Sequence, residues 1–322
     1  MTDPIFIVGS GRSGTSLLRA ILNAHPNIHL GQESALFMWR GRWPGLKAGA
    51  FEKAWKNTAS GSLFKAEPVQ VDPDAPSEHY IRAVLEARSA RFSATRWGDK
   101  TPLHAMTMDK ILACFPNAKF IAMSRHPVTT VASLRRMCWG TGTVLGDSFM
   151  VKKAREKIRE TPGVLRLKLE ELLQDPETQL RRVLEHIGED WHPNLLEHEK
   201  GDYSADPRLP WLTTAENPLT PWREPSVKLE PKEVRMIERI NPPELDGYPR
   251  WTEPEGVREF GFFAAQLGAL LSLGGTTFAS GPSIKPNVAS PAEQLSFLFT
   301  LNGSVPPPEG LLEHLIAELE PT

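Results

Sequence analysis

Short hydrophobic runs alternate with stretches of helical spacing along the N-terminal part of the chain. Residues 5–8 are a continuous apolar run that ends in a glycine-rich turn, and leucine and isoleucine then recur at helical spacing over 16–24. Apolar runs at 119–124 and 164–169 are each followed by a helical pattern, the second of them over 176–187. Strands that alternate with helices predict an α/β protein in three layers, with a central parallel sheet flanked by helices.

Two further stretches have a different character. Residues 34–97 are rich in aromatic residues, glycine and proline, with a helical pattern near 79–92, so this insert either covers one rim of the sheet or contributes to binding of a substrate. Toward the C-terminus, glycines and then prolines interrupt the apolar positions, before a short amphipathic helix at 309–319. We therefore expect one α/β domain over 1–255 and an extension over 256–322, which either packs on the domain or forms a homodimer.

The charge balance limits the classes of partner. The 322 residues include 37 basic and 39 acidic side chains, a net charge of −2, which argues against a surface built to bind nucleic acid or an anionic membrane. Any anion site must therefore be local. The two cysteines, Cys114 and Cys138, match neither a disulfide framework nor a zinc-binding pattern, so we expect no bound metal.

The sequence also bears on localisation. Met-Thr-Asp-Pro at the N-terminus leads directly into the first apolar run, without the basic region and cleavage site of a secretory signal. The most lipid-like stretch, residues 262–273, is shorter than the roughly 20 residues that a membrane-spanning helix needs. We therefore expect a cytoplasmic protein with no stable membrane insertion, and a buried or interface helix over 262–273.

The glycine-rich turn after the first apolar run has the features of a phosphate-binding loop. Gly9 and Gly14 have the spacing of a P-loop, which directs backbone N–H groups and a helix N-terminus at an anion. The next residue is Thr15, where a nucleoside triphosphatase carries a lysine, and the cation of this loop is Arg12. The loop predicts a P-loop-like fold and disfavours a kinase or nucleotide hydrolase, which stays the alternative enzyme class.

Residues 9–18, Gly-Ser-Gly-Arg-Ser-Gly-Thr-Ser-Leu-Leu, resemble the 5′-phosphosulfate loop of sulfotransferases that use 3′-phosphoadenosine 5′-phosphosulfate (PAPS). The arginine-bearing form is that of many bacterial members and of the tyrosylprotein sulfotransferases. Further segments resemble the family in the order in which the family has them: Ala24–Asn27, Gly31–Glu33, Trp97–Pro102, Phe115–Phe120, Arg125–Ser133, Lys168–Pro176 and Trp222–Arg223. The resemblance covers about residues 4–250 and implies a PAPS-dependent sulfotransferase domain.

The resemblance divides the donor site between two motifs. It assigns the 5′-phosphosulfate to the loop residues Gly11, Arg12, Ser13, Gly14, Thr15 and Ser16. It assigns the 3′-phosphate to Arg125 and Ser133, one through a planar guanidinium and one through a hydroxyl, and adds the pair Trp222 and Arg223. The step from Arg125 to Ser133 runs from a strand end to the second turn of a helix, and we expect both at the carboxyl edge of the sheet.

Sulfuryl transfer needs a base for the acceptor hydroxyl and a cation for the leaving phosphate oxygen. The resemblance places Glu33 at the family's catalytic glutamate, and a carboxylate can accept a proton near neutral pH. Lys100 and Arg12 are the candidates for stabilising the developing charge. His104 is the alternative base, because cytosolic sulfotransferases carry a histidine two residues after the lysine, at the position of Pro102 here.

Two departures from the family pattern bear on the acceptor. Lys168-Leu-Glu170 lacks the tyrosine of the family's Arg-Tyr-Glu, and Ala35 stands where tyrosylprotein sulfotransferases have a substrate-binding arginine. We therefore expect a small-molecule or lipid hydroxyl as acceptor. Five aromatic residues of the insert either line an apolar acceptor cleft or form a core: Phe37, Trp39, Trp43, Phe51 and Trp55. A protein that binds the nucleotide without transferring sulfate is the remaining alternative.

Overall fold

The chain divides into two compact units. A computed structural model describes residues 3–42, 45–64, 66–137, 141, 143–200, 219–220 and 228–251. The first unit comprises Met1–Arg125 and Ala154–Glu224, and the second comprises His126–Lys153 and Pro225–Thr322. The helices expected at 262–273 and 309–319, and the whole extension 256–322, lie outside the described residues.

A five-stranded parallel sheet forms the centre of the first unit. Its strands are β1 (Ile5–Gly9), β2 (Ile28–Gln32), β3 (Arg96–Lys100), β4 (Lys119–Ser124) and β5 (Leu165–Lys168), in the spatial order β2-β3-β1-β4-β5. The predicted parallel sheet is thus confirmed, with β1, β4 and β5 at the three expected places. β2 and β3 have no counterpart among the predicted strands, because glycine and polar residues interrupt their apolar pattern.

Helices connect the strands of this unit. The helices of the first unit are α1 (Thr15–Asn23), α2 (Leu36–Arg42), α3 (Ala48–Lys56), α4 (Ala59–Phe64), α5 (Ser77–Ala90), α6 (Met108–Cys114), α9 (Leu169–Gln174), α10 (Pro176–Ile187) and the 3-10 helices η1 (Pro102–Thr107) and η2 (Pro193–Lys200). α10 ends at Gly188, whose left-handed φ of 72° is typical of a helix C-terminus. α8 (Val144–Glu160) has residues in both units.

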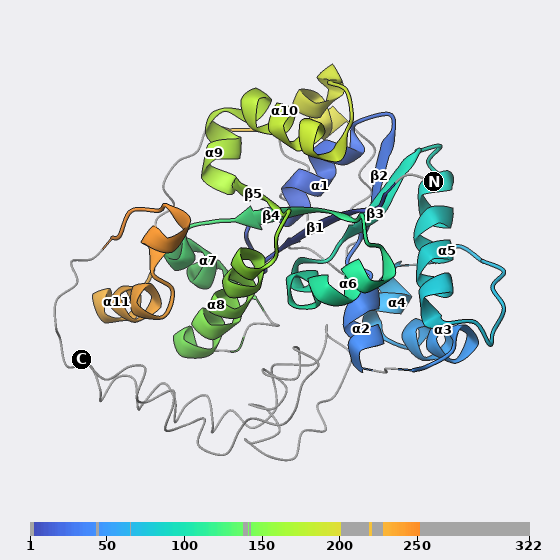
Figure 1. The fold of residues 1–322 in the computed structure, drawn as a ribbon. Coiled ribbons are helices and arrows are strands. Elements are labelled where there is room, and N and C mark those ends of the chain that lie inside the picture. The colour runs from blue at the N-terminus through green and yellow to red at the C-terminus, as the bar shows by residue number, and fades with distance from the viewer. Residues whose placement is uncertain are drawn as a thin grey trace, which may run out of the picture. The chain divides into compact units, whose positions relative to one another are not determined.

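The two faces of the sheet pack against different helices (Figure 1). On one face, Ile5 and Ile7 of β1 pack with Leu18 of α1 and with apolar residues of α9 and α10. On the other face, Phe6 and Val8 of β1 pack with residues of α2, α3, α5 and α6. Successive residues of a strand point to opposite faces, which explains why β1 is apolar at every position from 5 to 8. The predicted three-layer arrangement is confirmed.

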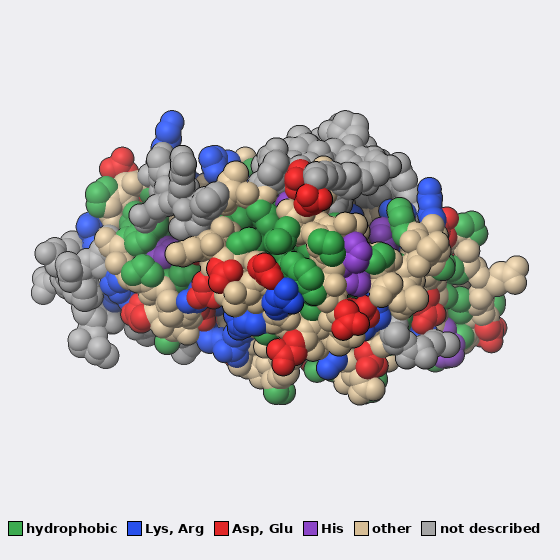
Figure 2. Space-filling model, turned by 90° about the horizontal axis from the view of Figure 1, so that it is seen from above, with side chains coloured by type: hydrophobic (Ala, Val, Ile, Leu, Met, Phe, Trp, Pro, Cys, Tyr) green, Lys and Arg blue, Asp and Glu red, His purple; other side chains and the backbone are tan. Residues whose placement is uncertain are grey.

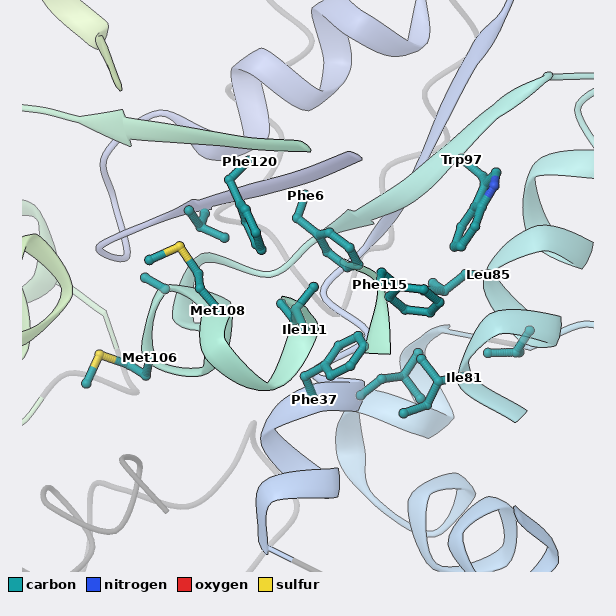
Figure 3. Close-up of a cluster of buried hydrophobic side chains, with 14 of the residues drawn as sticks. Phe6, Phe37, Ile81, Leu85, Trp97, Met106, Met108, Ile111, Phe115 and Phe120 are labelled. Atoms are coloured by element: carbon teal, nitrogen blue, oxygen red, sulfur yellow. The ribbon is translucent and has the colours of Figure 1, made fainter. Parts of the chain in front are cut away.

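Phe6 lies at the centre of an aromatic cluster on the second of these faces (Figure 3). Its ring centroid is 5.8 Å from the centroids of Phe37 and Phe120 and 6.4 Å from that of Phe115. These rings come from β1, α2, β4 and the end of α6. Aromatic contacts at these distances add to the free energy of burial, so the cluster fixes α2 and α6 on the sheet.

The insert between β2 and β3 builds its own part of this core. Phe37, Phe51 and Trp55 are fully buried, and Trp39 is partly buried against the same cluster. The idea that the insert's aromatic residues line an acceptor cleft is therefore wrong for the three buried side chains, because apolar neighbours occupy their surfaces. Trp43 lies outside the described residues.

The second unit has a smaller core of its own. It contains α7 (Pro127–Leu134), the first part of α8, α11 (Pro231–Ile240) and the 3-10 helix η4 (Pro243–Asp246). His126 caps α7, because its Nδ1 accepts a hydrogen bond from the Val128 N–H at 3.3 Å. The other ring nitrogen contacts the Pro249 carbonyl at 2.8 Å, and the ring stacks on Trp251 at 4.5 Å.

Figure 2 shows a face on which basic and acidic side chains are interspersed among the described residues. This mixture is what a net charge of −2 leads us to expect. Among the helices that the structure describes, none combines the length and the apolar character needed to cross a bilayer.

The close pairing of β1 with β3 leaves no space for a side chain at Gly98. A Cβ at this position would lie 1.7 Å from the Ile5 carbonyl oxygen, which is backbone and cannot move without breaking the sheet. We expect Gly98→Ala to lower the free energy of unfolding by about 3 kcal/mol or more. Gly41→Ala in α2 is the control, because its Cβ would meet the flexible end of Lys110, at Nζ, at 2.8 Å. Urea unfolding of both variants checks the prediction, and equal losses would contradict it.

Candidate active site

The loop between β1 and α1 leads the chain into a helix N-terminus. Gly14 precedes α1 with a left-handed φ of 95°, and a Cβ there would lie 2.8 Å from Leu169 Cδ1, so both conformation and space favour glycine. Ser13 is fully buried, and its hydroxyl donates to the Ser10 carbonyl at 2.7 Å. Arg12 is half-buried, with a φ of 70°. The positive end of the α1 dipole therefore meets this loop.

Glu33, Lys100 and Ser16 meet where β2 and β3 end and α1 begins. Lys100 Nζ lies 2.5 Å from Glu33 Oε1 and 3.1 Å from Ser16 Oγ. The sheet register explains the contact: Gln32 lies opposite Lys100, and the N–H of Glu33 donates to the Lys100 carbonyl at 2.7 Å. A hydroxyl of the glycine-rich loop, a cation and a carboxylate are thus in direct contact.

The two charges of this pair differ in exposure. Lys100 is completely buried, whereas the Glu33 side chain is 37% exposed. Burial lowers the pKa of Lys100, and the negative charge of Glu33 opposes part of that change. A buried ammonium is costly unless it is paired and hydrogen-bonded, and Glu33 and Ser16 meet both needs. The carboxylate is therefore the member of the pair that solvent can reach.

Arg125 lies beside the loop. It directly follows β4, and its Nη1 donates to the Arg12 carbonyl at 3.4 Å. Gly11 of the loop is half-buried, and Thr15 is buried. Since the carboxyl ends of parallel strands share one edge of a sheet, the residues that follow β1, β2, β3 and β4 gather there. The strand order also changes direction at β1, which is where ligands bind in open α/β sheets.

The remaining residues of the predicted donor site lie in the second unit or outside the described residues. Ser133 belongs to the second unit, where it is buried in the second turn of α7. Trp222 and Arg223 lie outside the described residues. Within the described parts of the chain, no group of three or more His, Cys, Asp or Glu side chains is arranged to hold a metal ion.

His104 lies in the aromatic core. Its completely buried ring packs edge-on against Phe6 and Phe37, at centroid distances of 6.2 and 5.7 Å. Its Nδ1 is 3.4 Å from Asp99 Oδ2. Burial lowers the pKa of His104 to about 3, so the imidazole is neutral at pH 7. His104 therefore shares the face of the sheet that carries Phe6, whereas Lys100 points to the face of α1.

Asp99 and Thr101, on either side of Lys100, belong to the site although sequence reasoning does not single them out. Asp99 is completely buried and accepts hydrogen bonds from the Thr101 hydroxyl at 2.6 Å and from the Ser34 N–H at 3.3 Å. Burial raises the pKa of Asp99 to about 6, and these hydrogen bonds oppose that rise. The one signal in the sequence is that Asp99 places a carboxylate directly before Lys100.

The chain matches a known family over more than half of its length. A model described as "Sulfotransferase family" matches residues 4–193. The chain is 30% identical over 217 residues to protein-tyrosine sulfotransferase A of Caenorhabditis elegans, which covers 62% of this chain and 53% of that protein. It is 28% identical over 211 residues to a protein-tyrosine sulfotransferase of Drosophila melanogaster, which covers 61% of this chain and 40% of that protein. The chain thus spans about half the length of these two curated relatives.

Solved structures give further similarities. The sulfotransferase domain from the Synechococcus PCC 7002 olefin synthase has a TM-score of 0.48 and 22% identity, with 74% of this chain and 95% of that chain covered. The sulfotransferase domain from the curacin biosynthetic pathway has a TM-score of 0.46 and 20% identity, with 83% of this chain and 98% of that chain covered.

The burial of neutral His104 predicts a pH dependence of stability. The unfolded chain binds a proton at this histidine below about pH 6.5, whereas the folded chain does so only below about pH 3. The free energy of unfolding therefore decreases as the pH is lowered through this window. In His104→Phe this contribution is absent. We expect the loss of unfolding free energy between pH 7 and pH 5 to be about 2 kcal/mol smaller in the variant.

Urea unfolding of the wild type and His104→Phe at the two pH values measures this difference. The raised pKa of Asp99 acts in the opposite direction between about pH 4 and 6, but Asp99 is present in both proteins. An equal loss in the two proteins would show that His104 does not change its protonation on unfolding.

Proposed function

The chain belongs to the sulfotransferase family, and we propose that it transfers a sulfuryl group from PAPS to a hydroxyl of a small-molecule or lipid acceptor, releasing adenosine 3′,5′-bisphosphate. The contact among Ser16, Lys100 and Glu33 carries this proposal. It joins the hydroxyl of a phosphate-binding loop, a cation and an accessible carboxylate at one point. Transfer from an anionic donor to a hydroxyl uses all three, for binding, charge stabilisation and proton removal.

In the proposed reaction, Glu33 accepts the proton of the acceptor hydroxyl. The acceptor oxygen forms a bond to sulfur while the bond from sulfur to the 5′-phosphate oxygen breaks, and that oxygen keeps the electron pair. Lys100, which lies against both Glu33 and Ser16, stabilises the charge that develops there, together with Arg12 of the loop. The low polarity around a buried ammonium strengthens this interaction.

The residues around the loop fit a donor with phosphate groups at two positions. Arg12, the Ser16 hydroxyl and the N-terminus of α1 suit the phosphosulfate, because guanidinium and backbone N–H groups both bind oxyanions. The Arg125 guanidinium lies beside this loop, through its hydrogen bond to the Arg12 carbonyl. We assign it to the 3′-phosphate, with Ser133 and the Trp222–Arg223 pair added on the strength of the motif.

Glu33 is favoured over His104 as the base. The Glu33 carboxylate is partly exposed beside Lys100 and the loop, so an acceptor hydroxyl can approach it. His104 is completely buried among aromatic rings, and a residue must come within hydrogen-bond reach of the proton that it removes. The same comparison favours an enzyme over a protein that only binds the nucleotide, because binding alone has no use for an exposed carboxylate next to the anion site.

The acceptor proposal rests on Ala35. Its methyl side chain is buried and supplies no charge where the tyrosylprotein enzymes have an arginine. A protein tyrosine is the second candidate, and the names of the two curated relatives favour it. The test is to incubate the protein and labelled PAPS with three panels: small phenols and alcohols, lipid hydroxyls, and tyrosine peptides. Label in one of the first two panels supports a small-molecule or lipid acceptor, and label in the peptides supports a protein tyrosine.

Glu33→Gln tests the proposed base. The amide keeps the size of the side chain and a hydrogen-bond acceptor for Lys100, but it cannot take a proton at neutral pH. We expect kcat for label transfer to fall by about 10²-fold or more, without weaker binding of adenosine 3′,5′-bisphosphate. Glu52→Gln is the matched control, because Glu52 pairs with Lys56 on the surface of α3. Unchanged transfer by Glu33→Gln would remove Glu33 from the mechanism.

Arg125→Ala tests the donor. Only adenosine 3′,5′-bisphosphate has the 3′-phosphate, so the variant should lose about tenfold to a hundredfold in affinity for it and much less for adenosine 5′-monophosphate. Calorimetric titration of wild type and variant with both nucleotides measures the difference. Equal losses would refute the assignment of Arg125. Thermal stabilisation of the wild type by ATP with Mg²⁺, and not by the bisphosphate, would instead support a kinase or nucleotide hydrolase.

A further inference from the structure

Three successive backbone N–H groups after β2 are held by three successive residues of the neighbouring strand end. The N–H of Glu33 donates to the Lys100 carbonyl at 2.7 Å. The N–H of Ser34 donates to Asp99 Oδ1 at 3.3 Å, and the N–H of Ala35 donates to Thr101 Oγ1 at 3.1 Å. The segment 33–35 is thus attached to the segment 99–101 at every residue.

The attached segment has an unfavourable backbone conformation. Glu33 and Ala35 have φ values of 49° and 51°, in the left-handed region that side chains with a Cβ rarely adopt. Such residues cost about 1–2 kcal/mol each and persist only where the surroundings hold them. Here the surroundings do so from both sides, because the Ser34 carbonyl also accepts a hydrogen bond from Trp55 Nε1 at 2.9 Å.

The side chains that hold the turn are themselves buried and connected. Asp99, Thr101 and Ser34 are at most 5% exposed. The Thr101 hydroxyl donates to Asp99 Oδ2 at 2.6 Å while it accepts from Ala35, so its only proton is fixed in one direction. Asp99 cannot serve as the base itself, because no part of it reaches solvent.

We propose that Asp99 and Thr101 are positioning residues for the reaction, which hold the left-handed turn that directs the Glu33 carboxylate at Lys100 and at the acceptor hydroxyl. This inference rests on the proposed function of Glu33. Alternation along the strand end makes the arrangement possible. Lys100 contacts Glu33 and Ser16 with its side chain, while the side chains of Asp99 and Thr101 bind the backbone of the same turn.

Thr101→Val and Thr101→Ser form the matched test. Valine keeps the shape of threonine but removes the hydroxyl that receives the Ala35 N–H, whereas serine keeps the hydroxyl. We expect Thr101→Val to lower kcat for label transfer by tenfold to a hundredfold, as about 1 Å of misplacement does, with the Kd of adenosine 3′,5′-bisphosphate within about twofold of wild type. Thr101→Ser should retain most of the activity.

A double variant separates positioning from a general structural effect. If Thr101 acts through Glu33, adding Thr101→Val to a protein that already carries Glu33→Gln should lower kcat for label transfer by at most about twofold. The same factor in both backgrounds, or equal activity of Thr101→Val and Thr101→Ser, would overturn the proposal. Should Thr101→Val fail to fold, Asp99→Asn replaces it, because its single amide oxygen can accept from the Thr101 hydroxyl or from the Ser34 N–H but not from both; full activity of that variant would also overturn the proposal.

Amide hydrogen exchange distinguishes failure of this proposal from failure of the proposed function. The Ser34 and Ala35 amides should exchange slowly in the wild type and in Thr101→Ser and at least tenfold faster in Thr101→Val, whether or not an acceptor is known. Equal protection in all three proteins would show that Thr101 does not hold the turn. A wild type that transfers label to no panel but shows the expected exchange would overturn the catalytic role and leave the geometry standing.

Discussion

Complete burial of the Lys100 ammonium is the constraint on which the arrangement of this sheet edge depends. An unpaired ammonium at such a position would cost several kcal/mol, and removing a partner of a buried pair costs about 3–5 kcal/mol. Glu33 and Ser16 must therefore both reach Lys100 Nζ, which requires the end of β2, the end of β3 and the start of α1 to meet. The parallel register supplies this meeting point, because Gln32 and Lys100 lie opposite each other in the last step of their ladder.

The insert takes part in the site through its core. Trp55 of α3 is completely buried, its ring contacts those of Phe64 and Tyr80, and its N–H holds the Ser34 carbonyl. The turn that carries Glu33 is thus bound on one side by the strand end and on the other by the packed insert. Trp55 thus belongs to the core of the insert and also holds the turn that carries Glu33.

Sequence reasoning reaches the parts of this fold that local pattern encodes. β1, β4, β5 and α10 follow from apolar runs and helix signals, and the resemblance to the family indicates Glu33 and Lys100 by number. Sequence reasoning misses β2 and β3, because Gly31, Gly98 and charged residues interrupt the apolar pattern. Only the pairing partners across the sheet make those residues acceptable in strands. Asp99 and Thr101 escape for the same reason, since their hydrogen bonds join segments 65 and 66 residues apart. The catalytic and donor-binding roles of all the predicted site residues, Glu33 and Lys100 included, stay predictions.

Topology, and not composition, concentrates cations at one edge of the sheet in a chain whose net charge is −2. Arg12, Lys100 and Arg125 follow or end three different strands, and parallel strands bring those ends to one edge, beside the N-terminus of α1. Pairing with Glu33 keeps Lys100 stable when no donor is present. In the proposed reaction, a donor oxyanion that reached Lys100 would compete with Glu33 for the same ammonium, and donor binding would weaken the hold on the proposed base. The buried pair would thereby couple binding of the proposed donor to the availability of the proposed base.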